Sequence, residues 1–238
     1  MFDFTAQVVM VTGGVGNLGS ATARAFLAAG AKLVPVDRAQ DRLEETFADL
    51  VGSPDHYLAG NVDLTDPASA QAAVDETITR LGRIDVLVNT VGGYRAGDPL
   101  HATSLDTLDF MFSLNVRTLF IMSQAVVPHM LDQGSGKIVN VSSRAGLEGK
   151  KNSAAYAAAK SAVIRLTESM SAELKRSGIN VNCILPGTID TPQNRAEMPN
   201  ADFNRWVAPQ ALANVIMFLA SDAAQAVHGV ALPVYGLS

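Results

Sequence analysis

Short apolar runs alternate with amphipathic stretches from one end of the chain to the other. The runs are nearly continuous in valine, isoleucine and leucine, as expected for strands that are buried on both faces of a sheet. We expect strands at 7–13, 32–37, 56–62, 84–90, 136–143, 179–186 and 230–236, and helices at about 18–29, 40–50, 67–81, 104–131, 153–176 and 209–221. This alternation predicts the α/β class, with a seven-stranded, mostly parallel, doubly wound sheet and helices on both faces.

No linker, internal repeat or low-complexity tract interrupts the pattern, so residues 1–238 are expected to form a single domain. Hydrophobic residues make up 48% of the chain and charged residues only 17%, which leaves ample apolar surface to bury. The formal net charge is −5 and basic residues form no long run, a pattern that argues against a nucleic-acid partner. The four histidines are scattered without metal-ligand spacing, so no metal site is expected.

The N-terminal segment and the cysteine content indicate the compartment. Residues 1–14 hold neither a basic segment nor a long apolar one, so no signal peptide is expected. No stretch of eighteen consecutive apolar residues occurs, and we therefore expect no membrane span. The one cysteine, Cys183, lies in the apolar run NVNCIL and cannot form an intrachain disulfide. These features favour a cytoplasmic protein.

The first predicted strand runs directly into the glycine-rich segment TGGVGNLG at 12–19, and a long amphipathic helix follows. Such a turn lets backbone amides approach a pyrophosphate at the helix N-terminus, as in dinucleotide-binding folds of the Rossmann type. Two spacings fit this segment: Gly-x-Gly-x-x-Gly at Gly14, Gly16 and Gly19, and Thr12-Gly13 followed by Asn17 and Gly19. The spacing alone does not separate nucleotide binding from a structural turn, because any tight strand–helix turn favours glycine.

An acidic residue, Asp37, closes the second predicted strand, eighteen residues beyond Gly19. A carboxylate at this place accepts hydrogen bonds from the adenine ribose hydroxyls and repels a 2′-phosphate. NAD is therefore the expected cofactor, with NADP less favoured. The alternative is a strand-end aspartate that caps the next helix.

Tyr156 and Lys160 lie four residues apart in the alanine-rich segment SAAYAAAKSAV, so a helix places them on one face, one turn apart. A lysine ammonium near a phenol favours the phenolate and lowers the pKa of the tyrosine. Taken alone, the pair is more typical of a tyrosine at a helix rim beside a solvated lysine.

These segments resemble the classical short-chain dehydrogenases/reductases, over nearly the whole chain. Seven features occur in the order and spacing of that family. They are TGGVGNLG at 12–19 (TGxxxGxG), DLTD at 63–66 (DVTD), NTVGG at 89–93 (NNAG), Asn115 in SLNVRT, Ser143 thirteen residues before Tyr156, the Tyr156-x-x-x-Lys160 pair, and PGTIDT at 186–191 (PGxxxT). Their joint order indicates that Tyr156 and Lys160 are catalytic.

The resemblance implies an oxidoreductase that moves a hydride between a nicotinamide cofactor and a secondary alcohol or ketone. Tyr156 is the expected acid and base, Ser143 the partner of the substrate oxygen, and Asn115 the holder of a water that links Lys160, which also binds the nicotinamide ribose, to solvent. The implied cofactor contacts are Gly13, Asn17, Leu18, Gly19, Asp37, Arg38, Asp63, Leu64, Asn89, Val91, Gly92, Tyr156, Lys160, Pro186, Gly187, Ile189 and Thr191.

Three positions depart from the family pattern. Asn17 replaces the usual middle glycine, and the turn is expected to survive because asparagine adopts positive φ more readily than other non-glycine residues. Thr90 replaces the second asparagine of NNAG, where a β-branched residue suits a strand end. The chain ends in VYGLS, whereas many relatives end in a Gly-Gly turn that takes part in subunit contacts.

Two other functions stay open. One is an NADPH-dependent 3-ketoacyl-type carbonyl reductase, in which Arg38 meets the 2′-phosphate; Asp37 and the lack of Lys or Arg at 14–18 argue against it. The other is a non-catalytic dinucleotide sensor, which would have no need of Ser143. The expected substrate is a small molecule, and its pocket is expected in the loops 92–99, 144–153 and 188–208. The charges of these loops hint only weakly at a polar or anionic substrate and fit ordinary solvated loop charge better.

The two helices at 104–131 and 153–176 carry apolar residues on all sides. The sheet covers only one side of each, and a large apolar patch in water is rare in soluble monomers. We therefore expect a homo-oligomer through these helices, most simply a homotetramer with closed symmetry.

Overall fold

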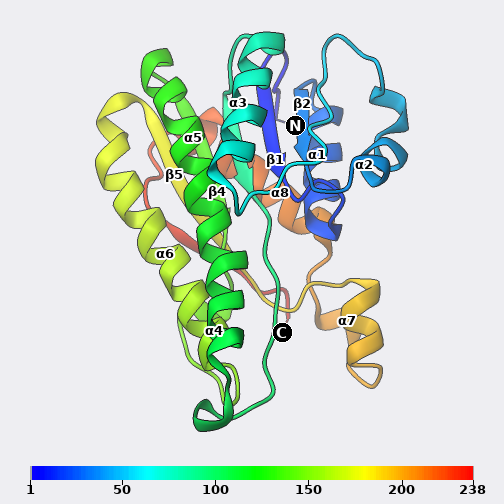
Figure 1. The fold of residues 1–238 in the computed structure, drawn as a ribbon, viewed down its shortest axis with the longest axis vertical. Coiled ribbons are helices and arrows are strands. Elements are labelled where there is room, and N and C mark those ends of the chain that lie inside the picture. Colours follow the sequence, from blue (N-terminus) through cyan, green and yellow to red (C-terminus); the bar gives the residue numbers. More distant parts are fainter. Residues whose placement is uncertain (1, 238) are drawn as a thin grey trace.

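The computed structural model describes residues 2–237 and contains one parallel sheet of six strands (Figure 1). The strands are β1 (Val8–Thr12), β2 (Lys32–Val36), β3 (Val86–Asn89), β4 (Gly136–Val141), β5 (Ile179–Pro186) and β6 (Ala231–Val234). Their order across the sheet is β2-β1-β3-β4-β5-β6. The reversal of strand order next to β1 is the arrangement of a doubly wound fold, so the predicted fold class is confirmed.

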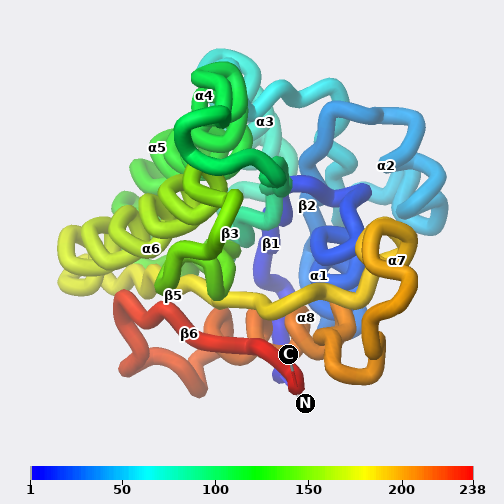
Figure 2. Tube along the Cα trace, turned by 90° about the horizontal axis from the view of Figure 1, so that it is seen from below, coloured from blue at the N-terminus to red at the C-terminus, as the bar shows by residue number. Residues whose placement is uncertain are grey.

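Helices cover both faces of the sheet (Figure 2). They are α1 (Asn17–Ala28), α2 (Gln40–Thr46), α3 (Pro67–Leu81), α4 (Leu105–Phe112), α5 (Thr118–Gln133), α6 (Ala154–Leu174), α7 (Pro192–Glu197) and α8 (Pro209–Ala220). Along β1 the side chains alternate between the two layers: Val9 and Val11 pack with the core under α1 and α8, whereas Val8 and Met10 pack with the core under α3 and α5. This two-residue period explains why the strand is apolar throughout.

The seventh strand expected at 56–62 does not form, and only a single bridge joins Ala59 to Val36 beside β2. Backbone N–H groups of Tyr57 and Ala59 donate to the oxygens of Leu33 and Pro35, each at 3.0 Å, as in a parallel ladder. The N–H of Asp37 returns a hydrogen bond to the oxygen of Ala59 at 3.0 Å, which completes the one bridge. The bridge before it does not form because Pro35 has no N–H to return to Tyr57. In addition, the N–H of Leu33 donates to Nδ1 of His56 at 3.0 Å instead of to a backbone oxygen. The prediction of a seventh strand was wrong for this reason.

The long helix expected at 104–131 is interrupted by a π-helical turn, Ser113–Arg117, which separates α4 from α5. Single π-turns inside helices occur often at functional sites, and this one contains Asn115. By length and composition alone, Leu105–Gln133 is long and apolar enough to cross a membrane. Half of its most apolar window is buried within the protein.

Candidate active site

The carboxyl ends of the strands gather the residues that the sequence singles out. The turn after β1 takes a left-handed backbone at Gly13, with φ +69°. A Cβ atom at Gly19 would overlap the backbone oxygen of Gly13, so only glycine allows α1 to approach the strand end this closely. Gly13 and Gly19 therefore form a compact turn that leads straight into the helix.

The first turn of α1 has the properties of an anion-binding helix end. Gly16 is its N-cap in an extended conformation, no side chain caps it, and its first turn contains no acidic residue. Its leading N–H groups are thus directed to any anion placed before the helix, as the pyrophosphate of a dinucleotide requires. Asn17 is the first helical residue; the non-glycine residues with positive φ in the described chain are Ala6, Asn61 and Asn152. The turn survives, but it does not draw on the ability of asparagine to take positive φ.

Asp37 lies beside this turn. Its Oδ2 accepts the backbone N–H of Val15 at 3.3 Å, and its Oδ1 accepts that of Ala39 at 3.3 Å. The carboxylate thus joins the end of β2 to the glycine-rich turn. Asp37 is not the N-cap of α2, because that position belongs to Ala39.

The residue after Asp37 forms an ion pair across the adjoining loop. A guanidinium nitrogen of Arg38 lies 2.6 Å from Oδ1 of Asp63. The same oxygen accepts the N–H of Thr65 at 2.9 Å and its hydroxyl at 2.7 Å. The hydrogen bonds from Arg38 and Thr65 lower the pKa of Asp63 from its usual range to about 2. The side chain of Leu64 is buried in the same core cluster as residues of α3, which leaves only its backbone for a ligand.

At the end of β3, two neighbouring side chains have different roles. Asn89 points into the protein, where its amide nitrogen donates to Oδ1 of Asn140 at 2.9 Å and to Oγ of Ser123 at 3.4 Å. Thr90 donates its hydroxyl to the oxygen of Thr12 and accepts nothing from Asn89. The departure from the family pattern at Thr90 therefore ties the end of β3 to the end of β1.

Asn115 clamps the backbone of Gly93. Its amide nitrogen donates to the oxygens of Gly93 at 3.1 Å and Met111 at 3.0 Å, and its Oδ1 accepts the N–H of Gly93 at 3.1 Å. A Cβ on Gly92 would come within 2.8 Å of this Oδ1 and 3.1 Å of Nζ of Lys160. The amide nitrogen of Asn115 thus spends its hydrogens on the protein backbone, and its Oδ1 holds the N–H of Gly93.

Ser143, Tyr156 and Lys160 meet where β4 ends and α6 begins. The hydroxyl of Ser142 donates to the oxygen of Lys160 at 2.7 Å and fixes α6 to the strand end. Nζ of Lys160 donates to the oxygen of Val141 at 3.0 Å and lies 5.9 Å from the centroid of the Tyr156 ring. Oγ of Ser143 accepts the N–H of Ala145 at 3.2 Å, and the Ser143 hydroxyl forms a hydrogen bond with the phenol of Tyr156.

The pKa values in this cluster follow from burial. Burial raises the pKa of Tyr156, a hydrogen bond with Ser143 acts against this, and Tyr94 adds a smaller increase. Burial lowers the pKa of Lys160 to about 8. The expectation that Lys160 lowers the pKa of Tyr156 is not met by the protein alone, because the loss of water around the phenol outweighs any help from the ammonium.

The PGTIDT segment follows β5 and forms a short cap. The N–H of Gly187 donates to the oxygen of Val234 at 3.1 Å, which anchors the segment to β6. Thr191 is the N-cap of α7 and accepts the N–H of Asn194 at 3.1 Å, while the amide of Asn194 donates to the oxygen of Ile189 at 2.8 Å. In Figure 1, α7 projects from the body at the end where α4 and α6 begin.

Tyr94 lies in the loop 92–99, where the substrate pocket is expected, but the sequence analysis does not single it out. Its ring lies edge-on to that of Tyr156, with centroids 4.9 Å apart, and 65% of the residue is exposed. The next residue, Arg95, holds the loop by stacking its guanidinium 4.0 Å from the centroid of Phe110. An aromatic residue directly after NTVGG was the available signal, but nothing in the sequence sets its ring against that of Tyr156.

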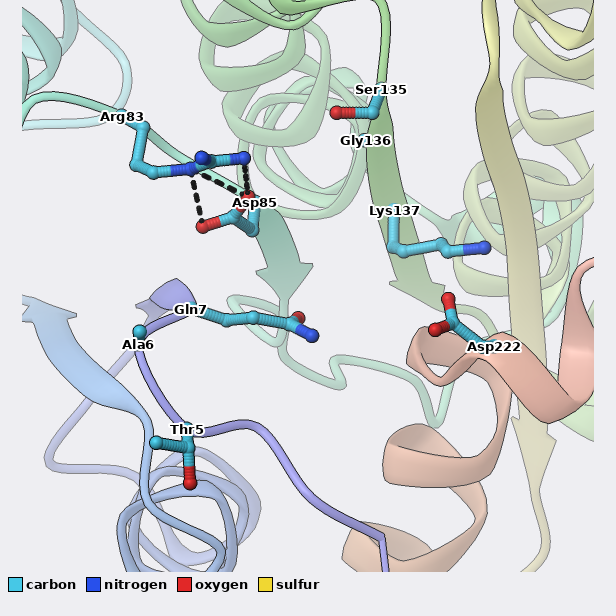
Figure 3. A pocket seen from close by; sticks show the side chains of 9 residues that line it. All are labelled: Thr5, Ala6, Gln7, Arg83, Asp85, Ser135, Gly136, Lys137 and Asp222. Atoms are coloured by element: carbon cyan, nitrogen blue, oxygen red, sulfur yellow. Dashed lines mark hydrogen bonds and ion pairs between the residues drawn. The ribbon is translucent and has the colours of Figure 1, made fainter.

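A hollow of about 310 Å³ lies at the opposite edge of the sheet, at the amino ends of β1, β3 and β4 (Figure 3). Three of its four charged groups are engaged by the protein: Arg83 pairs with Asp85 at 2.6 Å, and Lys137 donates to Asn180 at 2.8 Å; the fourth is Asp222. Asp85 in turn accepts the N–H of Val8 at 2.8 Å. Ligands of doubly wound sheets bind at the carboxyl ends of the strands, and this hollow is at the other end. Within residues 2–237, no three His, Cys, Asp or Glu side chains gather as metal ligands would.

Comparison with known proteins agrees with this geometry. The chain matches the model of the short chain dehydrogenase family over residues 7–202. It is 35% identical to 2-(R)-hydroxypropyl-CoM dehydrogenase of Xanthobacter autotrophicus, with 97% of this chain and 98% of the relative covered. It is also 35% identical to levodione reductase of Leifsonia aquatica, with 98% and 94% covered.

Solved structures give the same result. The crystal structure of levodione reductase superimposes with a TM-score of 0.89 at 35% identity, covering 98% of this chain and 97% of that one. Carveol dehydrogenase from Mycobacterium avium, crystallised with NAD, gives a TM-score of 0.89 at 28% identity, covering 99% and 98%.

The fold and the site define a nicotinamide-dependent oxidoreductase. The chain belongs to the short-chain dehydrogenases/reductases, and its relatives interconvert alcohol and carbonyl groups. The protein is accordingly an enzyme of that class, which acts on CH–OH or C=O groups.

Proposed function

We propose that the enzyme transfers a hydride between NAD(H) and a secondary alcohol or ketone, with Tyr156 as the acid and base. The observation that carries this proposal is the convergence of Ser143, Tyr156 and Lys160 at the strand ends, next to a glycine turn and an uncapped helix. The nicotinamide, when bound, supplies the acceptor or donor of the hydride.

Each side chain of the cluster has a defined task in this scheme. Tyr156 takes the proton from the substrate hydroxyl during oxidation and gives it to the carbonyl oxygen during reduction. Ser143 donates its hydroxyl hydrogen to the same oxygen and keeps that oxygen beside Tyr156. Lys160 spends one of its N–H groups on Val141 and keeps the others for the cofactor ribose. Asn115 acts through the backbone: by clamping Gly93 it holds the loop that carries Tyr94.

The phenol of Tyr156 is neutral at pH 7, because burial raises its pKa. That form is ready to protonate a carbonyl oxygen. Oxidation of an alcohol needs the phenolate, and the positive charge of an oxidised nicotinamide would favour it. The scheme therefore places the lowering of the Tyr156 pKa in the complex with the oxidised cofactor.

The proposal is tested by following NADH oxidation with a panel of cyclic and acyclic ketones, and NAD⁺ reduction with the matching alcohols. We expect turnover with at least one secondary alcohol–ketone pair. A protein that binds NADH but turns over no member of a broad panel would favour the non-catalytic dinucleotide sensor.

Asp37 supports NAD(H) over NADP(H). Its carboxylate stands beside the glycine turn, where it accepts hydrogen bonds from ribose hydroxyls and repels a 2′-phosphate. The runner-up, an NADPH-dependent 3-ketoacyl-type reductase, would need Arg38 at the phosphate. In the structure Arg38 is paired with Asp63.

We expect the Asp37→Ala variant to narrow the preference for NADH over NADPH, because it removes both the ribose acceptor and the repulsion. Fluorescence titration of each reduced cofactor measures the two dissociation constants. Tighter binding of NADPH than of NADH by the unaltered protein would contradict this reading of the site.

We further propose a cytoplasmic homotetramer that pairs the helices at 104–131 and 153–176 across two-fold axes. Five large apolar side chains stay exposed along α4 and α5: Leu105, Phe110, Phe112, Phe120 and Leu131. Helix α6 adds small residues at its surface, Ala154 and Ala158, which allow a close approach of helices. A second copy would cover these side chains.

The departure VYGLS at the C-terminus concerns the subunit contacts in which the C-terminal Gly-Gly turn of many relatives takes part. Strand β6 lies at the edge of the sheet, and Val230 and Val234 turn their oxygens to β5. Pro233 lies between them in the alternation and faces away from β5. Because proline has no N–H, this position of the edge offers no hydrogen-bond donor to another strand.

Light scattering at micromolar concentration should give four times the 25.0 kDa of one chain. A mass near that of one chain would refute the helix pairing.

A further inference from the structure

We propose that Asp63 sets the cofactor preference indirectly, by holding Arg38 so that its charge is not available to a 2′-phosphate. The inference rests on the proposed function, because it concerns the adenosine side of the same cofactor site. Asp63 is here a positioning residue: it acts on the phosphate through Arg38.

The contacts of Asp63 make the pair a fixed feature of the site. Three donors reach its Oδ1: a guanidinium nitrogen of Arg38 at 2.6 Å, the N–H of Thr65 at 2.9 Å and the hydroxyl of Thr65 at 2.7 Å. The backbone at Asp63 is held as well, since its N–H donates to Oγ of Ser69 at 3.0 Å. Nε of Arg117 donates to the oxygen of Thr65 at 3.3 Å and fixes the loop from the side of α5. The carboxylate is therefore pre-oriented toward Arg38.

The charges around the ribose position then favour one cofactor. Arg38 directly follows Asp37, whose carboxylate is bound to the glycine turn through Val15. An arginine at this place can accommodate a 2′-phosphate if it is free to do so. Paired with Asp63, Arg38 leaves the phosphate facing two carboxylates and a cation that is already neutralised. The pair is solvent-accessible, with side chains 66% and 44% exposed. Its effect on the ratio of the NADH and NADPH dissociation constants is therefore expected to be several-fold rather than many orders of magnitude.

Because both the Asp37 carboxylate and the Arg38–Asp63 pair disfavour a 2′-phosphate, removal of Asp37 alone would only narrow the preference for NADH over NADPH. Asp37→Ala takes away the first carboxylate, but Arg38 stays engaged by Asp63. Release of Arg38 requires a change at Asp63. The two substitutions together are therefore expected to raise NADPH binding by more than the product of their separate effects.

The test measures dissociation constants of NADH and NADPH by fluorescence titration at one low ionic strength, without any substrate. Asp63→Asn keeps the acceptor for Thr65 and removes the charge. It should raise the affinity for NADPH relative to NADH by about three- to tenfold. The ratio of the two constants is the readout, because any contact of Asp63 with the adenine is common to both cofactors and cancels.

Two matched variants complete the design. Asp66→Asn removes the same charge from the same loop but keeps a good N-cap for α3, since Asp66 caps through the N–H of Ala68 at 3.0 Å. Its ratio should match that of the unaltered protein. In an Arg38→Gln background, Asp63→Asn should leave the ratio unchanged within about twofold, the ordinary scatter of independent sites.

The outcomes separate the possibilities. An equal gain in Asp63→Asn and Asp66→Asn would show a general charge effect and overturn the proposal. A gain that persists in the Arg38→Gln background would show that Asp63 repels the phosphate directly, and would also overturn it. Failure of the unaltered protein to bind either cofactor would instead overturn the proposed function, and retention of NADH binding in Asp63→Asn shows that the variant is folded.

Discussion

Replacing Tyr156 by phenylalanine is expected to lower turnover by roughly two to four orders of magnitude, the range of general acid–base catalysis. The change keeps the ring that packs edge-on against Tyr94 and removes only the hydroxyl. Dissociation constants for NADH should therefore stay close to those of the unaltered enzyme. Steady-state kinetics with any substrate found in the ketone panel measures the effect.

The matched control is Tyr94→Phe, which removes a hydroxyl from the neighbouring ring but not from the proton carrier. Its turnover should change far less than that of Tyr156→Phe. The pH profile gives a second readout: because burial raises the pKa of Tyr156, oxidation should accelerate as pH rises and reduction should not. Near-normal turnover by Tyr156→Phe would contradict the role of Tyr156 as the acid and base.

Replacing Lys160 by methionine is expected to abolish most turnover and yet stabilise the cofactor-free protein at pH 7. Burial lowers the pKa of Lys160 from 10.5 to about 8. Below pH 8 the folded protein therefore buries a charged ammonium that water would solvate better. This burial destabilises the folded state, and the destabilisation is fully present at pH 7. It disappears as pH rises from about 8 to the unfolded value, because the lysine is then neutral in both states.

The increase in the free energy of unfolding is bounded by the difference between the folded and unfolded pKa of Lys160, which corresponds to about 3 kcal/mol at pH 7. The lost hydrogen bond to the oxygen of Val141 reduces it by about 1 kcal/mol. Urea unfolding at pH 7 and pH 10 measures the difference between the variant and the parent protein. The exposed Lys175→Met serves as the control, with changes within about 0.5 kcal/mol. A loss of stability in Lys160→Met, equal at both pH values, would contradict the buried-charge account.

Helices with local signals were predicted closely from the sequence. The helix expected at 67–81 is observed as Pro67–Leu81 because each of its ends is marked by nearby residues. Asp66 caps it, Pro67 fits its first turn, and Gly82 ends it with φ +81° and an N–H bond to Ile78. The same holds for the start of α1 and for the spacing of Tyr156 and Lys160, since an i, i+4 relation on a helix is a local property.

Elements that depend on a distant partner were less predictable. The segment 56–62 has a strand-like composition, but its pairing is limited by Pro35 in the neighbouring strand, and nothing within the segment reveals that. The π-turn at Ser113–Arg117 likewise lies inside a uniformly apolar helical pattern. Its position is recognisable only once Asn115 is seen to bond to Gly93, a residue of another loop.

The sequence by itself determined the fold class, the glycine turn, and the set of side chains able to carry out the chemistry, because these follow from periodicity and short spacings. Only the tertiary structure decided how they interact. It set Tyr94 against Tyr156, paired Arg38 with Asp63, and turned Asn89 into the core. It also reversed the expected direction of the Tyr156 pKa in the free protein, because desolvation depends on everything packed around a group and not on the residue four positions away.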